Sequence, residues 1–209
     1  MICTTEFDSP VGKITMAAEE ESLIGLWFEG QNYFESTISE KITKNDNLKL
    51  FTDARNWLDR YFAKKRPAIS ELPLLPSGSN FRKSVWRILC KVPYGEVTTY
   101  GKVACKIANE RGIAKMSAQA IGGALAHNPI SIIIPCHRVV GTDGSLIGYA
   151  GGIDRKIKLL ECEGVDVSKF FIPPQSNFAR KESLPPRVDD RKAVFLLESL
   201  VAERRARKS

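Results

Sequence analysis

Hydrophobic and polar positions follow different patterns in the two halves of the chain. In residues 2–28, apolar side chains occur in short runs separated by turn residues, which is typical of strands. We expect three strands there, at Ile2–Phe7, Lys13–Ala17 and Ser22–Phe28. In Asp53–Lys65 the apolar positions recur at helical spacing, so this segment is expected to form a helix that covers the sheet.

Helical patterns dominate after residue 80. A first amphipathic stripe, from Phe81 to Val92, stops at Pro93-Tyr94-Gly95. Three further helices are predicted from their capping residues: Thr99 before Tyr100–Ala108, Ser117 before Ala118–His127, and Asp154 before Arg155–Glu163, with Gly164 as the stop. The first two of these three are joined by a turn that contains glycine and resemble a helix-turn-helix, although a plain helical hairpin is the more common arrangement.

A buried strand is predicted for the apolar run Pro129–Ile134, and Asp143-Gly144 suits the tight turn of a hairpin. The pattern therefore predicts an α+β fold. An N-terminal α/β domain, residues 1–80, would hold a small antiparallel sheet with a helix. A mostly helical domain, residues 81–174, would hold the helix-turn-helix-like pair and the short hairpin. Residues 175–209 are predicted to be a basic C-terminal extension, for which a frayed or loosely docked tail is favoured over a DNA-tracking arm or a partner helix.

Composition narrows the class of protein. Of the 209 residues, 43% are hydrophobic and 26% are charged, as in an ordinary soluble globular protein. No apolar run approaches the ~20 residues that a membrane-spanning helix needs, and the first residues lack the features of a signal peptide. The five cysteines are irregularly spaced and do not indicate a disulfide framework. We therefore expect a cytoplasmic protein without a membrane partner.

The net charge of +7 is unevenly distributed. Residues 1–80 carry 9 Lys and Arg against 12 Asp and Glu, whereas residues 81–164 carry 12 against 6 and residues 180–209 carry 9 against 5. A basic region beside an acidic one indicates a polyanionic partner on one face. On charge alone, a basic surface that is merely solvated is an equally good interpretation.

Cys136, His137 and Arg138 bring a thiol, an imidazole and a guanidinium together directly after the predicted strand. A thiol reacts as its thiolate, and neighbouring positive charge favours that form. An isolated cysteine is more often a core residue, but a core cysteine does not need two basic neighbours. Cys136 is therefore the candidate nucleophile and His137 the base that deprotonates it.

The segment Ile134–Val140 resembles the active-site signature of the O6-alkylguanine-DNA alkyltransferases, also called methylated-DNA–protein-cysteine methyltransferases. The similarity extends over four motifs in order: Ala120–Ala124, Asn128-Pro129, Gly148–Gly152 and Leu159–Gly164 lie at matching spacing around it. It is strong from about Phe81 to Gly164, weak before that segment and absent after about Pro174.

The resemblance implies a DNA-repair enzyme that reverses damage directly. Such proteins transfer the alkyl group of O6-alkylguanine in double-stranded DNA to a cysteine, and activity on O4-alkylthymine stays open. The transfer is stoichiometric and irreversible, because a thioether is not readily hydrolysed, and it needs no cofactor. The guanine has to leave the duplex stack by base flipping, while a helix-turn-helix lies in the minor groove. A monomer is expected.

The resemblance also assigns catalytic roles beside Cys136. Glu163 matches the carboxylate that orients His137, and a bridging water is expected between imidazole and sulfur, because adjacent strand side chains point to opposite faces. A carboxylate at a helix C-terminus is disfavoured by the macrodipole, so Glu163 needs a partner such as His137. Tyr100 matches a tyrosine that contacts guanine N3 and assists the leaving group, with a core aromatic as the alternative. Asn128 matches an asparagine that links the recognition helix to the active-site strand, with an ordinary turn as the alternative.

Substrate and DNA contacts follow from the same similarity. The residues expected to bind the flipped guanine are Val139, Tyr149, Ala150, Gly151 and Gly152. The residues expected to contact DNA are Ser117, Gln119, Ala120, Gly122, Gly123 and Arg138. Arg138 is also a candidate for tying down a carboxylate or a helix end. The glycine pair could equally serve plain helix–helix packing, since each glycine costs the helix roughly 1 kcal/mol against alanine.

Two features depart from the family. Gln119 stands where the best-known members have an arginine that fills the gap left by the flipped base, so weaker DNA affinity or slower flipping is expected. The only histidines are His127 and His137, so the N-terminal zinc site of some members is missing and no metal is expected.

The sequence is also compatible with two functions other than alkyl transfer. One is a lesion-binding protein of the alkyltransferase-like type, which lacks the reactive cysteine, so the presence of Cys136 disfavours it. The other is an unrelated thiol enzyme such as a cysteine hydrolase. That enzyme would need an acyl substrate and an oxyanion hole, and it leaves Gly122-Gly123 unexplained.

Overall fold

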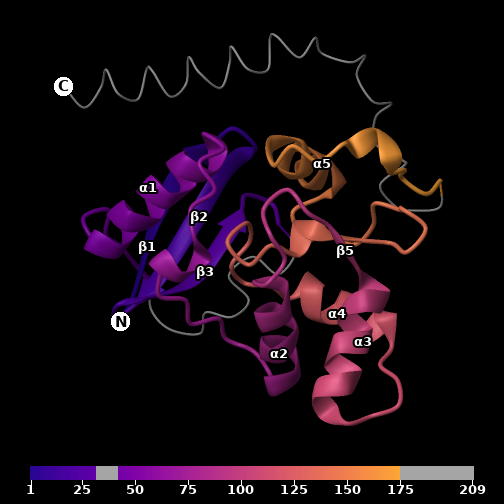
Figure 1. Cartoon of the computed structure of the whole chain (residues 1–209). Helices are drawn as coiled ribbons and strands as arrows, with labels where there is room; N and C mark the ends of the chain where they lie inside the picture. Colours follow the sequence, from indigo (N-terminus) through magenta and orange to yellow (C-terminus); the bar gives the residue numbers. More distant parts are fainter. Residues whose placement is uncertain (32–41, 175–209) are drawn as a thin grey trace. The chain divides into compact units, whose positions relative to one another are not determined.

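A four-stranded sheet opens the fold, in the strand order β3-β2-β1-β4 (Figure 1). The strands β1 (Ile2–Ser9), β2 (Gly12–Glu19) and β3 (Ser22–Phe28) are antiparallel neighbours, as the sequence predicts. The short strand β4 (Ile42–Lys44) pairs in parallel with β1 and was not predicted. The computed structural model describes residues 1–31 and 42–174, so the predicted basic extension lies outside the described residues.

The helix α1 (Lys49–Phe62) packs on one face of this sheet. Both its ends lie earlier than predicted: the helix begins four residues before Asp53 and ends three residues before Lys65. Its buried side chains are Phe51, Ala54, Trp57, Leu58, Tyr61 and Phe62. They share one hydrophobic core with strand residues such as Ile14, Met16 and Leu26. The predicted amphipathic face is thus the one that covers the sheet.

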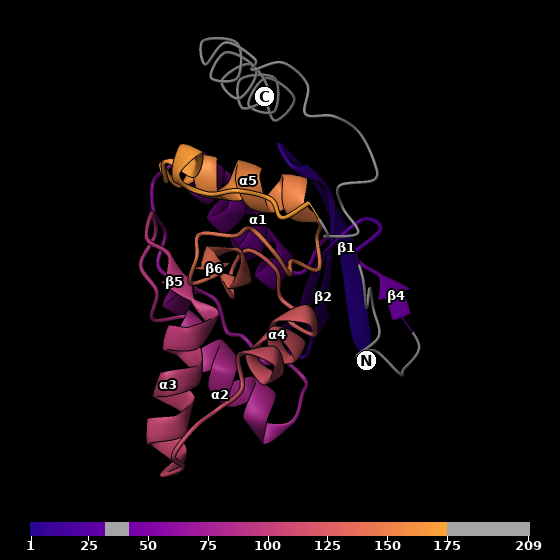
Figure 2. The same cartoon turned by 90° about the vertical axis from the view of Figure 1, so that its right-hand side faces the viewer.

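Three helices, α2 (Asn80–Leu89), α3 (Tyr100–Arg111) and α4 (Ala118–Ala126), pack against one another (Figure 2). The predicted caps are confirmed: Thr99 Oγ1 accepts from the Lys102 amide, and Ser117 Oγ accepts from the Gln119 amide. The αL residue Gly112, with φ of 64°, ends α3 and starts the connection to α4. The helix-turn-helix-like pair is therefore present.

The last helix, α5 (Ile153–Cys162), begins two residues earlier than predicted. Its N-cap is Gly152, so Asp154 lies in the first turn and is not the cap. Gly164 has φ of 81°, and the amides of Gly164 and Val165 return to the carbonyls of Glu161 and Leu160. This glycine ends the helix as predicted and fixes the direction in which Glu163 leaves it.

A regular buried strand was predicted at Pro129–Ile134, and this prediction is wrong, although the segment is buried. Only its first residues are extended: Pro129 O accepts from Leu26 N at 2.8 Å, and Ser131 N donates to Leu26 O at 2.8 Å. The chain then turns through Ile132, whose φ is 68°. The start of this segment pairs with the free edge of β3 through a bridge between Leu26 and Ile130. The rest of the apolar run is buried because it crosses the core, not because it forms a strand.

Cys136 is found in one turn of 3₁₀ helix, η2 (Cys136–Arg138), and not in an arm of a regular hairpin. The strand that follows, β6 (Val139–Val140), pairs in parallel with β5 (Thr98–Thr99), just before α3. The predicted turn is present, since Gly144 N donates to Gly141 O at 3.1 Å. Gly141 N also donates to Ser145 O at 2.8 Å, so the chain folds back at this turn, while β6 itself pairs with β5; the predicted α+β class is confirmed.

No helix within residues 1–31 and 42–174 is long and apolar enough to cross a membrane. The described residues up to Pro173, 1–31 and 42–173, form one compact unit, so both predicted domains contribute to a continuous core.

Candidate active site

The thiol of Cys136 is buried and accepts a hydrogen bond from the Asn128 side chain. Asn128 Nδ2 lies 3.0 Å from Cys136 Sγ and 2.9 Å from Ile134 O, while Asn128 Oδ1 accepts from Ile130 N at 3.1 Å. Burial raises the pKa of Cys136 to about 11, and the hydrogen bond from Asn128 opposes that rise. Asn128 therefore does more than connect two segments, because it donates directly to the sulfur.

The carboxylate of Glu163 receives five hydrogen bonds. Oε1 accepts from His137 Nε2 at 2.7 Å, Tyr61 Oη at 2.7 Å and Arg138 Nη2 at 2.9 Å. Oε2 accepts from Arg138 Nε at 2.9 Å and from the amide of Gly95 at 3.1 Å. Burial alone would raise the pKa of Glu163, but His137 and Arg138 outweigh it and lower the pKa to about 2. Glu163 is thus a fixed anion.

His137 is completely buried, and its two ring nitrogens face different surroundings. Burial lowers its pKa, against the opposing effect of Glu163, so the ring is neutral at pH 7. Because Nε2 faces a carboxylate, Nε2 carries the proton and Nδ1 is the free base. Nδ1 has no hydrogen-bond partner among the described side chains and backbone. The predicted orientation of His137 by Glu163 is therefore present, with a base nitrogen left over.

Lys156 is a buried cation that the sequence analysis missed. Its Nζ donates to Val139 O at 2.6 Å and to Ile147 O at 2.7 Å. Burial lowers its pKa to about 8, and its charge in turn lowers the pKa of the Cys136 thiol. A signal for it existed: Lys156 lies on the apolar face of α5, three residues from Ile153 and from Leu159.

Tyr100 is mostly buried at the start of α3, and its hydroxyl donates to Ile147 O at 3.0 Å and Gly148 O at 3.2 Å. Burial raises its pKa, and the charge of a Cys136 thiolate would raise it further, so the hydroxyl keeps its proton. A Cβ at Gly148 would lie 2.6 Å from this hydroxyl, which explains the glycine. The Tyr100 hydroxyl thus keeps its proton and donates it in hydrogen bonds to the segment that leads into the predicted substrate loop.

The predicted substrate loop, Tyr149–Gly152, packs on the N-terminal sheet. A Cβ at Gly151 would lie 2.7 Å from the Phe28 ring and 2.8 Å from the Tyr149 ring, so close packing requires glycine there. The guanidinium of Arg155 lies over Phe28 at 5.0 Å and donates to Gly151 O at 3.0 Å and Val11 O at 3.0 Å. The loop is therefore fixed to the sheet by the packing of Gly151 against Phe28 and by the hydrogen bonds of Arg155.

The predicted DNA-contacting residues of α4 form one accessible face. Ser117, Gln119 and Gly123 are exposed, and Ala120 and Gly122 are half-buried. A Cβ at Gly123 would meet nothing within 4 Å, and one at Gly122 would make only an ordinary contact with Tyr100 at 3.9 Å. Packing inside the described part of the protein therefore does not require either glycine.

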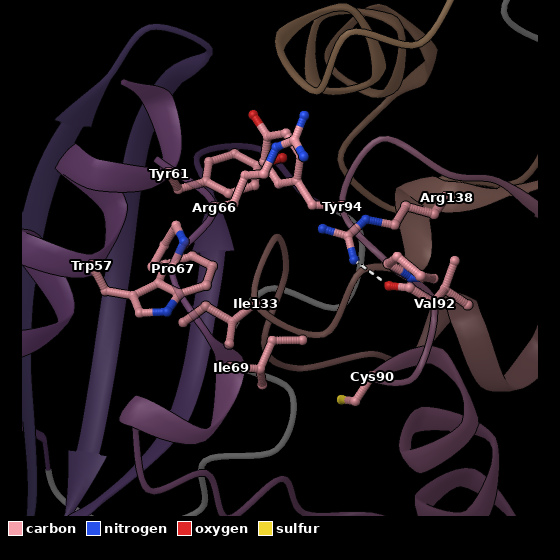
Figure 3. Close-up of a pocket in the computed structure, with 11 residues that line it drawn as sticks. Trp57, Tyr61, Arg66, Pro67, Ile69, Cys90, Val92, Tyr94, Ile133 and Arg138 are labelled. Carbon is pink, nitrogen blue, oxygen red and sulfur yellow. Dashed lines mark hydrogen bonds between the residues drawn. The ribbon is translucent and has the colours of Figure 1, made fainter. Parts of the chain in front are cut away.

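Arg138 was grouped with the predicted DNA contacts, and in the structure its side chain lies inside the protein. Its guanidinium is buried, pairs with both oxygens of Glu163 and donates through Nη1 to Val92 O at 2.5 Å (Figure 3). The position agrees with the alternative expectation, in which Arg138 binds a carboxylate of the protein, because that carboxylate is Glu163. A buried charge needs a partner, and this one is fully paired.

Arg138 and Tyr61 line a cavity of about 190 Å³ (Figure 3). Trp57, Tyr94 and Cys90 also contribute to its wall, and Cys136 does not. In the part of the chain that the structure describes, no group of three or more His, Cys, Asp or Glu side chains could hold a metal ion.

The site thus combines a buried thiol, a histidine held by a carboxylate and a helix-turn-helix-like pair. Residues 80–165 match the family described as "6-O-methylguanine DNA methyltransferase, DNA binding domain". Residues 2–76 match the one described as "6-O-methylguanine DNA methyltransferase, ribonuclease-like domain". The chain belongs to the 6-O-methylguanine DNA methyltransferase family.

Curated relatives and solved structures agree with this assignment. The methylated-DNA–protein-cysteine methyltransferase of Haemophilus influenzae is 38% identical over 161 residues, covering 77% of this chain and 86% of that protein. The one of Methanosarcina barkeri is 43% identical over 157 residues, covering 75% and 93%. The structure described as Mycobacterium tuberculosis OGT in complex with DNA has a TM-score of 0.66 and 36% identity, covering 81% of this chain and 94% of that one.

Proposed function

We propose that Cys136 takes the alkyl group from O6-alkylguanine in double-stranded DNA and keeps it, so that each molecule reacts once. The observation that carries this proposal is the buried Cys136 thiol, which Asn128 contacts at Sγ and which lies next to a neutral His137 held by Glu163. A soft sulfur nucleophile suits attack at an sp³ carbon. The products are an S-alkylcysteine and unmodified guanine.

The proton route follows from the two ring nitrogens of His137. Nε2 donates to Glu163, so Nδ1 accepts the proton of the Cys136 thiol through a water that bridges the two side chains. The S–C bond forms as the bond between the alkyl carbon and O6 breaks. The electron pair of that bond stays on the purine. Tyr100 donates a proton to N3 of the leaving guanine, and His137, protonated by the thiol, can return a proton to Tyr100.

The flipped guanine is proposed to lie between Tyr149 and the backbone of the loop that follows it. The carbonyls of Cys136 and Val139 accept from its exocyclic amine, and the Ala150 amide donates to O6. Lys156 already donates to Val139 O, so it orients one of these two carbonyls. Gly151 and Gly152 leave room for this close approach.

DNA is proposed to contact the exposed face of α4, with Ser117, Gln119, Ala120, Gly122 and Gly123 at the minor groove. Gln119 is expected to occupy the gap left by the flipped base less completely than an arginine would. On this proposal residues 1–80 support the site, and residues 81–174 bind DNA and carry the chemistry. We propose a monomer in a reducing cytoplasm, since all five cysteines are free thiols.

Intact mass spectrometry tests the reaction. After incubation with duplex DNA that contains one O6-methylguanine, the protein should gain the mass of one methyl group, mapped to Cys136. Cys136→Ala should gain none, whereas Cys105→Ala, which removes an exposed thiol on α3, should react as the wild type does. Tight binding to the lesion without a mass change would instead favour the lesion-binding function, and no binding with hydrolysis of acyl substrates would favour a cysteine hydrolase.

A further inference from the structure

Tyr61 is a residue of the N-terminal domain that contacts the catalytic groups of the C-terminal domain. It lies on α1 and precedes Glu163 by 102 positions in the sequence. Its hydroxyl donates to Glu163 Oε1 at 2.7 Å and lies 3.4 Å from His137 Nε2. The side chain is almost completely buried. Nothing in the reaction described above uses it.

Tyr61 and His137 both donate to Oε1 of Glu163, which also accepts from Arg138 Nη2. His137 Nε2 carries a proton because it faces the carboxylate, so the Tyr61 hydroxyl has to give its own proton to Oε1 and not to Nε2. Burial and the charge of Glu163 raise the pKa of Tyr61 well above its usual range, so the hydroxyl stays a donor. A hydrogen bond to an anion disperses its charge, and Oε1 therefore attracts the His137 proton less strongly than a bare oxygen would.

The position of the Tyr61 hydroxyl is fixed by aromatic packing. Its ring stacks on Trp57 with centroids 5.6 Å apart and an interplanar angle of 10°. The rings of Phe62 and Tyr94 meet it edge-on at 5.1 Å and 5.6 Å. Figure 3 shows Tyr61 and Trp57 on the helix beside the sheet, opposite Arg138. Two of these rings, Trp57 and Phe62, lie on α1 beside Tyr61, so the N-terminal domain carries the donor, and Tyr94 packs against it from the segment after α2.

We propose that Tyr61 is a positioning residue of the relay, through which the N-terminal domain sets the basicity of His137. The inference rests on the proposed function. Without the hydroxyl, more negative charge on Oε1 faces the imidazole, so His137 holds its proton to higher pH. Neutral His137 is the base, so the rate of alkyl transfer should then rise at higher pH than in the wild type.

Other ionisable groups face the same two side chains. Around His137 and Tyr61 these are Glu163, Arg138, Lys156, Cys136, Cys162, Tyr94 and Tyr149. Tyr94 provides the matched control, because its hydroxyl donates to Cys162 O at 3.0 Å and has no hydrogen bond to Glu163 or His137 among the described contacts. Tyr61→Phe and Tyr94→Phe each remove one partly or fully buried phenol hydroxyl from neighbouring rings.

The test is the single-turnover rate of methyl transfer as a function of pH, with the affinity for lesion DNA measured separately. In Tyr61→Phe the acid limb should move up by on the order of one pH unit, so that the rate below it falls roughly tenfold. Affinity for DNA should stay unchanged, and Tyr94→Phe should keep the wild-type profile. A profile of Tyr61→Phe that matches the wild type, or an equal shift in both variants, would overturn the proposal.

A second readout does not depend on activity. The chain has two histidines, so ¹⁵N-histidine NMR of the full chain gives two sets of ring signals, with His127 as the internal reference. We expect the neutral Nε2–H form of His137 in the wild type, and protonation of His137 at higher pH in Tyr61→Phe but not in Tyr94→Phe. If the wild type transfers no methyl group, the proposed function fails while this titration still decides the role of Tyr61. Identical His137 titrations in all three proteins would contradict it.

Discussion

The Cys136 thiol experiences opposing influences within a few ångströms. Burial favours the protonated form, while the Asn128 amide and the charge of Lys156 favour the thiolate. The result is a thiol that stays protonated at rest and needs a base, the role that the proposed function gives to His137 Nδ1. Such a thiol is protected from solvent oxidants until a substrate arrives, because reactivity follows thiolate character and exposure.

Lys156→Met is expected to make Cys136 less reactive. The variant removes a buried charge that lowers the pKa of the thiol, so the thiolate fraction at pH 7 should fall, roughly tenfold for each unit by which the pKa rises. The measurement is the pH dependence of Cys136 alkylation by a small electrophile, followed by mass spectrometry. Lys158→Met, which removes an exposed charge from the same helix, is the control and should leave the profile unchanged. Equal profiles for both variants would show that the charge of Lys156 does not act on the thiol.

At the scale of the element, α4 has a composition that favours a partner over its own stability. Two adjacent glycines weaken a nine-residue helix, and the described structure gives neither a contact that would exclude a side chain. On the proposed function, they provide a smooth surface that DNA can approach closely. The exposed Ser117, which caps the helix, and Gln119 in its first turn lie at the N-terminal end, where the backbone amides point outward.

Gly123→Ala should therefore separate stability from binding. The new methyl group enters open space, so the helix should gain roughly 1 kcal/mol, visible as a higher melting temperature. The same methyl group stands on the proposed DNA-facing surface, so the affinity for duplex DNA should fall. Thermal unfolding and DNA titration on the same preparation check both signs. A more stable variant with undiminished DNA affinity would remove this face of α4 from the interface.

At the scale of the whole molecule, Glu163 joins segments that are far apart in the sequence. It follows α5, and its five donors come from α1, from η2 and from the Pro93–Gly95 turn. Arg138 extends the same network to the end of α2 through Val92 O. A single carboxylate thus connects the N-terminal domain, the nucleophile segment and the last helix, so its ionisation should affect the stability of the entire unit.

Acid unfolding measures this connection. The pKa of Glu163 falls from 4.5 to about 2 on folding, so its stabilising contribution is complete above pH 4.5 and is lost as the pH drops towards 2. The difference is worth roughly 3 kcal/mol. Urea unfolding of the wild type should show this loss between those pH values. Glu163→Gln, which cannot ionise, should be less stable at pH 7 and should lose less stability in the same range; parallel curves for the two proteins would contradict the assignment.

The sequence predicted the local elements because their signals are local. Ser117 and Gly164 mark helix ends through hydrogen bonds within a few residues, and the apolar period of α1 identifies the face that is buried. The candidates Cys136, His137, Glu163 and Asn128 came from spacing and from a family resemblance, and the structure brings all four together.

Other features could not be predicted, because they depend on which distant segments meet. The run at Pro129–Ile134 has the composition of a strand, but the edge of β3 pairs with only its first residues and the core forces the rest to turn. Arg138 beside a nucleophile is compatible with binding a phosphate or a carboxylate. Only the arrival of Glu163 from α5 decides that it is buried and paired.

By itself, the sequence determined most of the helices, the caps Thr99 and Ser117 and the α+β class, and it supplied Cys136 as the candidate nucleophile, since these signals lie in neighbouring residues. The tertiary structure alone decided the partners of the relay. Tyr61 is indistinguishable from any core aromatic of an amphipathic helix until α1 packs, and Lys156 is one more basic residue until α5 turns it inward. Hydrogen bonds and charge effects act over a few ångströms of space, whereas sequence patterns report on proximity along the chain.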